Sequence, residues 1–245
     1  MNTLWLASAA GQGEAAAEHG GGALFSILGL EVTSAVTTMW AIMVILLLLF
    51  WLATRRMERV PRSRRQVIVE FVVESLQNFL EGLLGPKKAR QLLPFLGTFF
   101  LFILVSNYSG LLPGAGEIKG FKPPTSNWGV TAGLAVIIFF SVQYLGIRKK
   151  GIGYFKHFVE PWYLSPLMLP LGILEELVKP FSLSLRLFAN IFGGETVLLA
   201  LLLAIPYVLP VSVLFLELVF GFVQAFIFTL LSAVYIANAT AEEHH

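Results

Sequence analysis

The stretch KPFSLSLRLFANIFGGETVLLALLLA, residues 179–204, has the apolar composition of a membrane helix but carries Arg186 in its first half. Arginine stays charged in proteins because its pKa lies above about 12. A charge at the centre of a membrane helix costs about 2.5–3.5 kcal/mol even on the lenient insertion scale. The stretch therefore predicts a membrane segment that keeps its arginine for a function.

The whole chain has the composition of an integral membrane protein. Of its 245 residues, 56% are hydrophobic and 13% are charged, whereas an average soluble domain has about 25% charged residues. The mean hydropathy is +0.77. The chain has no cysteine, which excludes disulfides and thiolate metal sites, and its four histidines lie outside the apolar runs. We therefore expect neither a cofactor nor a metal site.

The apolar runs predict the organisation of the chain. We expect one all-α polytopic membrane domain over residues 1–245, with five membrane helices and one amphipathic helix at the interface. The amphipathic helix is indicated by apolar residues at helical spacing, with glutamates and amides between them. The predicted parts are an outer N-terminal segment (1–33), a first span (34–54), the amphipathic interfacial helix (66–84), a helical hairpin (92–147) and a long helix pair (166–240).

The basic residues predict the orientation. Only Lys119 and Lys122 lie in predicted outer segments. The predicted inner segments hold thirteen basic residues: Arg55, Arg56, Arg59, Arg62, Arg64, Arg65, Lys87, Lys88, Arg90, Arg148, Lys149, Lys150 and Lys156. By the positive-inside rule the N-terminus is outside and the C-terminus is cytoplasmic. An N-terminus without transit-peptide features favours a bacterial plasma (inner) membrane or an organelle-encoded protein.

The last two helices are too long for a simple crossing. A helix from Pro166 to Ala204 would run roughly 55–60 Å at 1.5 Å per residue, whereas the hydrocarbon core is about 30 Å thick. We expect this helix to tilt steeply, to bend or to lie partly in the membrane plane, with Pro170 and Pro180 as the natural bend points. The sequence IPYVLP ends it, and the helix over 211–239 is similarly long. Two long, tilted helices packed as a hairpin present a broad face to another membrane component.

Polar residues interrupt this helix pair at defined spacings. Arg186 and Asn190 are four residues apart and share one helix face. Glu217 and Gln224, seven residues apart, share a face of the last helix. Glu195 is about half a turn around the helix from Arg186, so we expect it to face Glu217 near the outer end while Arg186 faces elsewhere.

Two glutamates mark the other end of the pair. Glu175 and Glu176 precede Lys179 near the expected inner interface, where they are either solvated or paired. The order is then carboxylates, a fixed cation, and carboxylates again, which resembles two polar access routes separated by a positive charge.

Structural interpretations of these residues stay open. Amides such as Asn190 and Gln224 also form hydrogen bonds between membrane helices. Arg186 is also compatible with a structural ion pair to Glu195 or Glu217, although a buried pair is costly even when matched.

Several motifs resemble one family, the a subunit of F-type ATP synthases. They are LEELVKPFSLS (174–184), SLSLRLFANIFGGE (182–195), GFVQAFIFTLLSAVYI (221–236) and the terminal AEEHH. The resemblance covers nearly the whole chain and is most specific around Arg186. It implies a non-catalytic, proton-translocating subunit with two offset half-channels against a ring of c subunits. It also implies b-type peripheral stalk subunits, the rest of the synthase complex and membrane lipid as partners, with no nucleic acid.

The resemblance also implies roles for individual residues. Arg186 matches the essential arginine that faces the carboxylates of the ring, and Asn190 and Gln224 match polar positions beside it. Glu195 and Glu217 match positions that line the outer half-channel. We take Glu175 and Glu176 as candidates for the inner route.

Two other classes of protein remain as alternatives. A stand-alone ion channel or secondary transporter would use Arg186 as a gate or anion site, and a membrane scaffold would use it only for stability. Hydrolysis of ATP by this chain is not expected, because the sequence contains no G-x-x-x-x-G-K-[ST] phosphate loop.

Overall fold

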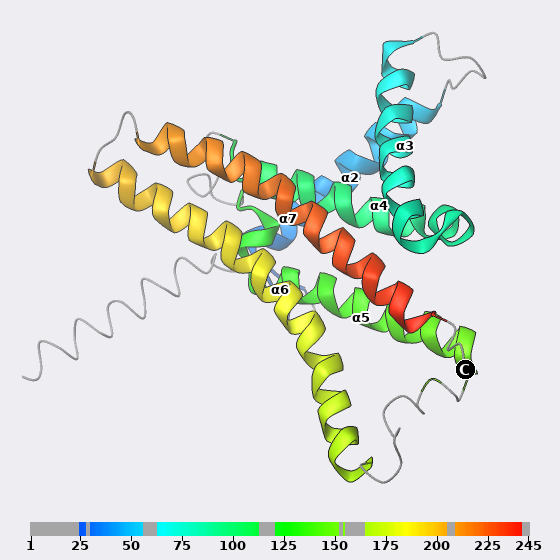
Figure 1. Ribbon diagram of the computed structural model, residues 1–245. Coiled ribbons are helices and arrows are strands. Elements are labelled where there is room, and N and C mark those ends of the chain that lie inside the picture. The colour runs from blue at the N-terminus through cyan, green and yellow to red at the C-terminus, as the bar shows by residue number, and fades with distance from the viewer. Residues whose placement is uncertain are drawn as a thin grey trace, which may run out of the picture.

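The computed structural model describes residues 25–27, 30–55, 63–112, 121–151, 154, 165–204 and 209–241. Within these residues helices dominate the fold (Figure 1). Six are α-helices: α2 (Ser34–Thr54), α3 (Arg64–Leu84), α4 (Pro86–Ser109), α5 (Trp128–Lys150), α6 (Ser165–Ala204) and α7 (Leu209–Ala239). A short 3-10 helix, η1 (Pro124–Ser126), precedes α5.

A small antiparallel hairpin precedes the helices. Strand β1 (Phe25–Ile27) pairs with β2 (Leu30–Val32), with Phe25 opposite Val32. The expectation of an all-α chain is therefore wrong for this short segment. Aromatic and β-branched residues favour strands, but three-residue strands are too short to give a clear alternating pattern in the sequence.

Four helices are long and apolar enough to cross a membrane, judged by length and composition within the described residues. They are α2, α4, α5 and the part of α7 from Val211 to Ala239. The long helix α6 is not among the helices found within the described residues. The fifth span is therefore not confirmed and stays a prediction, as does the interfacial position of α3.

The turn between α3 and α4 has clear local causes. Ser63 caps α3 by accepting a hydrogen bond from the backbone N–H of Gln66 at 3.2 Å. The helix ends at Gly85, whose φ of 75° favours glycine. Pro86 then occupies the first turn of α4, where its missing N–H costs nothing. The helix thus begins at Pro86 and not at residue 92, the predicted start of the hairpin.

Helix α6 is one continuous helix of 40 residues that bends along its length (Figure 1). Pro170 and Pro180 lie inside it, and a proline removes a backbone hydrogen bond and kinks a helix. The half of α6 that follows the bend runs beside α7, whereas the half before the bend turns away from α7 (Figure 1). The predicted bend and hairpin packing are both seen.

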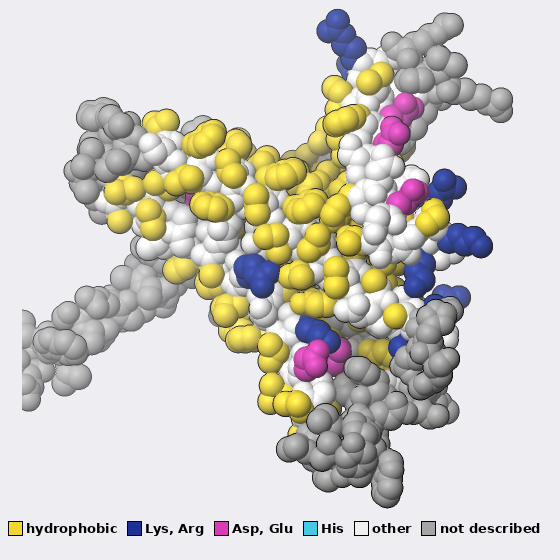
Figure 2. Space-filling model, viewed as in Figure 1, with side chains coloured by type: hydrophobic (Ala, Val, Ile, Leu, Met, Phe, Trp, Pro, Cys, Tyr) yellow, Lys and Arg dark blue, Asp and Glu magenta, His cyan; other side chains and the backbone are white. Residues whose placement is uncertain are grey.

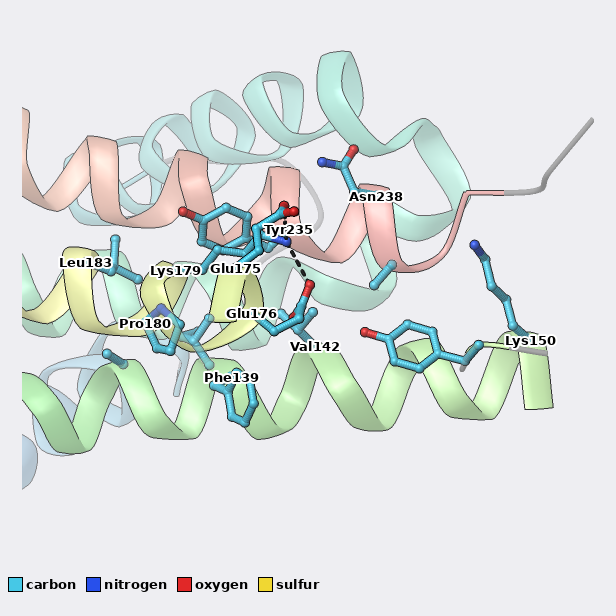
Figure 3. Close-up of a pocket in the computed structure, with 14 residues that line it drawn as sticks. Phe139, Val142, Lys150, Glu175, Glu176, Lys179, Pro180, Leu183, Tyr235 and Asn238 are labelled. Atoms are coloured by element: carbon cyan, nitrogen blue, oxygen red, sulfur yellow. Dashed lines mark hydrogen bonds and ion pairs between the residues drawn. The ribbon is translucent and has the colours of Figure 1, made fainter. Parts of the chain in front are cut away.

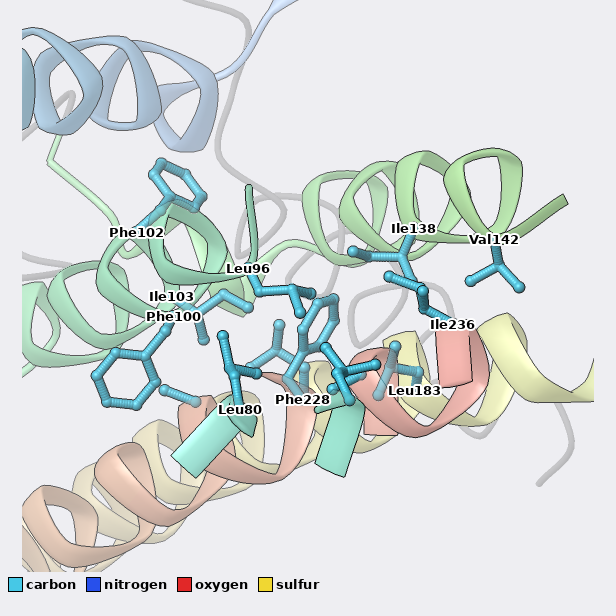
Figure 4. Packing of buried hydrophobic residues seen from close by; sticks show 14 of the residues in the cluster. Leu80, Leu96, Phe100, Phe102, Ile103, Ile138, Val142, Leu183, Phe228 and Ile236 are labelled. Atoms are coloured by element: carbon cyan, nitrogen blue, oxygen red, sulfur yellow. The ribbon is translucent and has the colours of Figure 1, made fainter. Parts of the chain in front are cut away.

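The hydrophobic core lies where α3, α4, α5, α6 and α7 meet (Figure 4). Phe228 of α7 is at its centre, and its ring stacks on Phe99 of α4 at 6.1 Å between centroids. Other fully buried side chains around it are Leu80, Leu96, Ile103, Leu183, Leu187 and Ile236. This packing fixes α6 and α7 against the rest of the bundle.

Polar contacts show which helix ends lie together. Lys88 at the start of α4 donates to Thr240 Oγ1 at 2.9 Å, and Lys149 at the end of α5 donates to the Thr240 carbonyl at 2.8 Å. Both cations thereby complement the negative end of the α7 dipole. At the opposite end, the backbone N–H of Lys122 donates to Thr38 Oγ1 of α2 at 3.3 Å. The first end carries the basic clusters, and the second end carries η1.

Removing the Phe228 ring should destabilise the bundle. The Phe228 side chain is 0% exposed, and deleting a buried phenylalanine ring costs about 3–5 kcal/mol. We expect Phe228→Ala to lower the thermal unfolding midpoint of the detergent-solubilised protein. Phe215→Ala on the same helix is the control, because Phe215 is 66% exposed and should change the midpoint little. Equal effects of the two variants would contradict the described core.

Candidate ion-pathway site on α6 and α7

Arg186 lies on the exposed face of α6. Its neighbours Leu183 and Leu187 are buried in the core, whereas Leu185 and Phe192 are exposed like Arg186 itself. Figure 2 shows dark blue basic side chains standing over α6 within a largely yellow surface. Among the described residues, Arg186 makes no hydrogen bond or ion pair. The structural interpretation, an ion pair of Arg186 with Glu195 or Glu217, is therefore not seen.

The two amides beside Arg186 differ in burial. Asn190, one turn further along α6, is half-buried. Gln224 of α7 is 5% exposed, and its Nε2 has no hydrogen-bond partner among the described residues. A buried amide of this kind is unusual, since interior polar groups are almost always bonded to protein or water.

Further buried polar atoms lie on the elements around Gln224. Asn107 of α4 donates through Nδ2 to the carbonyl of Gly221 on α7 at 2.9 Å. Its Oδ1, together with Ser106 Oγ and Thr125 Oγ1, has no hydrogen-bond partner among the described residues. Groups like these normally bind internal water. The region where α4, η1 and α7 meet is thus polar inside an otherwise apolar bundle.

Glu195 and Glu217 form a pair of carboxyl groups between α6 and α7. Both are half-buried and close enough for their charges to repel. Gly194 makes this approach possible, because a Cβ at position 194 would overlap the Glu217 carboxyl group. The Glu217 carboxyl group thus lies against the residue that precedes Glu195, whereas Arg186 lies on the exposed face of α6; that Glu195 itself faces Glu217 stays a prediction.

The second acidic pair is tied to a lysine. Lys179 Nζ lies 3.1 Å from Glu175 Oε1 and 2.7 Å from Glu176 Oε1. Gln143 of α5 donates to Glu176 Oε2 at 2.8 Å. The Glu175 side chain is 68% exposed and that of Glu176 only 19%. Of the two interpretations left open by the sequence, pairing is the one observed.

These residues border a cavity of about 280 Å³ between α5, α6 and α7 (Figure 3). Its polar lining includes Glu175, Glu176, Lys179, Tyr235 and Asn238. The cavity lies toward the end of the bundle that carries the basic clusters, because Lys150 and Ala239 also line it.

Tyr154 closes part of this cavity. Burial, and secondarily the charge of Glu176, raises the pKa of its phenol above the usual value. Its ring packs on Gly146 of α5, where an added Cβ would lie 2.6 Å from the ring. The phenol therefore stays neutral and is held by backbone contact.

The predicted site residues thus fall into separate groups. Arg186 and Asn190 lie between the Glu195–Glu217 pair toward one end and the Glu175–Glu176 pair toward the other. The sequence analysis did not identify Gln143 or Gly194, whose importance comes from contacts between distant elements. Only the double glycine before Glu195 was visible in the sequence as a signal of close packing.

With four helices apolar enough to cross a bilayer, the chain is an integral membrane protein.

The family described as ATP synthase A chain matches residues 36–237. The ATP synthase subunit a of Moorella thermoacetica is 43% identical over 216 residues, covering 88% of this chain and 94% of that protein. The ATP synthase subunit a 1 of Syntrophotalea carbinolica is 41% identical over 210 residues, covering 85% of this chain and 86% of that protein. The ATP synthase subunit a of Geobacter sulfurreducens is 39% identical over 211 residues, covering 86% of this chain and 89% of that protein.

A family match over residues 36–237 covers most of the chain and shows the family to which it belongs. The matched region contains all of α3, α4, α5 and α6, and therefore the whole of the site on α6. The chain belongs to the ATP synthase subunit a family.

The two adjacent glycines of α6 provide a matched test of the Glu217 position. A Cβ at Gly194 would displace the Glu217 carboxyl group, whereas a Cβ at Gly193 meets nothing within 4 Å. We expect Gly194→Ala to reduce ATP synthesis by the assembled complex several-fold and Gly193→Ala to leave it near the wild-type rate. Both alanines favour the helix by about 1 kcal/mol, so assembly should be normal in both. Equal rates of ATP synthesis in the two variants would contradict the described contact.

Proposed function

We propose that this chain is the proton-translocating subunit of the membrane sector of an F-type ATP synthase. It forms two offset half-channels against a ring of c subunits, and Arg186 separates the two. The chain itself is non-catalytic, and ATP is made or hydrolysed by other subunits of the complex.

The observation that carries this proposal is the position of Arg186. A permanent cation on the exposed, apolar face of α6 has no partner among the described residues. A charge in that setting is costly unless another molecule supplies its counterion. A membrane carboxylate on a neighbouring ring would do so, and the exposed side chains of α6 and α7 are largely hydrophobic, as in Figure 2.

The outer route runs through the Glu195–Glu217 pair. Two carboxyl groups this close favour a state in which one holds a proton. The unpaired buried atoms of Asn107, Thr125 and Gln224 supply polar sites on α4, η1 and α7 that water can occupy. Such a path delivers protons from the outside to the vicinity of Arg186.

The inner route begins at the cavity that contains Glu175 and Glu176. Glu176 is the less exposed of the two and is held by both Lys179 and Gln143. The cavity opens among polar side chains of the first half of α6, with Glu175 and Glu176 about three turns before Arg186 and Leu183 less than one turn from it. The two routes therefore reach Arg186 from opposite ends of the helix.

The energies of the proposed steps are comparable. A ring carboxylate 4 Å from Arg186 gains about 4 kcal/mol at an effective dielectric of 20, as an upper-end figure. One charge moving through 200 mV gains about 4.6 kcal/mol. An incoming proton can therefore displace the carboxylate from Arg186, while the cation blocks direct passage of protons between the routes.

The proposal also includes the partners of the chain and its orientation in the membrane. The partners are the c ring, b-type peripheral stalk subunits, the remaining subunits of the complex and membrane lipid. The membrane is a bacterial plasma membrane, and the distribution of basic residues favours an N-terminus outside and a C-terminus in the cytoplasm. The bonds of Lys88 and Lys149 to Thr240 support this arrangement, because they bring three predicted inner segments together.

Neutralising Arg186 tests this function. We expect Arg186→Ala to abolish coupled ATP synthesis by reconstituted complex while leaving assembly largely intact, because the side chain has no partner within the described chain. Arg186→Lys should also fail, since lysine lacks the planar fork and loses its proton more readily when buried. Arg148→Ala, which removes an exposed cation at the end of α5, is the charge control.

Two results would refute the proposal. One is normal ATP-driven proton pumping by the Arg186→Ala complex. The other is proton conduction by the purified chain alone at the rate of the full complex, because the proposed path is completed only by the ring. The second result would favour a stand-alone channel.

A further inference from the structure

The cavity between α5, α6 and α7 holds two neighbouring carboxyl groups, Glu175 and Glu176, whose contacts differ (Figure 3). Glu176 is bonded at both of its oxygens. Lys179 Nζ donates to Oε1 at 2.7 Å, and Gln143 Nε2 donates to Oε2 at 2.8 Å. The Glu176 side chain is 19% exposed. Glu175 is 68% exposed, and its one polar contact among the described residues is Lys179 Nζ, 3.1 Å from Oε1.

The contacts of Glu176 match the ionised carboxylate. An ammonium group only donates hydrogen bonds, and an ionised carboxylate only accepts them. Gln143 also donates to Glu176, through its amide nitrogen. A protonated Glu176 would direct its own hydrogen at one of these donors, so that a bond is lost or the Gln143 amide has to turn over. Proton uptake by Glu176 therefore weakens contacts that are strongest when the carboxyl group is charged.

The charges in the cavity indicate that one of the two carboxyl groups takes up a proton. Glu175 and Glu176 share the single cation Lys179, and two like charges this close disfavour ionisation of both. They are the only acidic side chains that line the cavity within the described part of the chain. The other titratable side chains of its lining are Lys150, Tyr154 and Tyr235. Glu175 is the exposed carboxyl group with fewer bonds, so it takes up the proton at lower cost.

We propose that Gln143 is a positioning residue that, together with Lys179, holds Glu176 as a fixed anion, so that Glu175 is the carboxyl group of the inner route that gains and loses a proton. The inference rests on the function proposed above for this cavity. The fixed anion also keeps Lys179 in the cavity, where its Nζ lies 6.0 Å from the centre of the Tyr235 ring.

Labelling with a water-soluble carbodiimide tests this assignment. The reagent activates carboxyl groups that carry a proton, and an added amine then converts them to amides that mass spectrometry locates in the sequence. In the assembled complex at mildly acidic pH we expect modification of Glu175 and protection of Glu176. Modification of Glu176 at the rate of Glu175 would overturn the proposal.

Variants of Gln143 separate ionisation from exposure, because low exposure alone also protects Glu176. Gln143→Met removes the donor while nearly keeping the side-chain volume. A hydrogen bond to a charged group changes a protonation equilibrium by about tenfold, so Glu176 should be modified up to about tenfold faster in this variant.

Ser141→Ala is the control for this substitution. It also removes a polar group from α5, but Ser141 Oγ bonds within its own helix, to the Ile137 carbonyl at 2.7 Å. Modification of Glu176 should keep the wild-type rate in this variant. An unchanged rate in Gln143→Met, or an equal increase in Ser141→Ala, would contradict the role of Gln143. Should Gln143→Met fail to assemble, Gln143→Leu replaces it, with the same expected increase and the same contradicting result.

Two amide substitutions of matched shape test the division of roles in transport. ATP-driven pumping takes up protons from the inner side, and its rate is normalised to ATP hydrolysis by the same complex. Glu175→Gln should reduce the rate several-fold and make it less dependent on the inner-side pH, because the titrating group is lost. Glu176→Gln should reduce it less and keep that dependence, because Glu175 still titrates. Equal losses, or a larger loss in Glu176→Gln, would refute the assignment.

These measurements separate the inference from the function on which it rests. If both amide variants pump at the wild-type rate, the assignment of the cavity to the inner route is wrong, and the role of Glu175 fails with it. If Glu175→Gln blocks pumping but carbodiimide modifies Glu176 as fast as Glu175, the proposed function stands and only the role of Gln143 is overturned.

Discussion

A cation that cannot lose its charge, placed on an exposed apolar helix face, constrains everything else in this protein. Arg186 has a hydrophobic core behind it and exposed leucine and phenylalanine side chains beside it. The family to which the chain belongs and the position of this residue lead to the same proposal, in which the missing counterion is part of a neighbouring subunit. On this proposal the exposed surface of α6 and α7 contacts a neighbouring subunit and does not face lipid alone.

The same constraint explains why the two acidic pairs are kept apart. Glu195 and Glu217 meet at Gly194, whereas Glu175 and Glu176 are bound to Lys179 beyond the bend of α6. Glu195 lies nine residues after Arg186 and Glu176 ten residues before it, which is about 13–15 Å along the helix axis in each direction. Neither carboxylate is therefore within ion-pair distance of Arg186. A continuous helix of 40 residues separates them by length, and its bend turns the first half away from α7.

Much of this arrangement could be predicted from the sequence because it depends on local periodicity. Apolar runs gave the positions of α2, α5 and α7, the prolines indicated the bend in α6, and the spacing of Glu195 from Arg186 indicated opposite faces. The hydrogen bond of Gln143 to Glu176 could not be predicted, since it joins two helices through residues 33 positions apart in the sequence. The early start of α4 at Pro86 was missed because the charged residues that follow it do not resemble a span, although Gly85 and Pro86 are good helix boundaries.

The central claim is that the Arg186 face contacts another protein and not lipid, and site-directed photo-cross-linking tests it most directly. The chain has no cysteine, so Ala189→Cys introduces a unique thiol at an exposed position of α6, next to Asn190 and close to Arg186. After attachment of a photoreactive group in native membranes, the account predicts a cross-link to a small membrane subunit that carries a carboxylate within its span. Cross-links to lipid alone would contradict it.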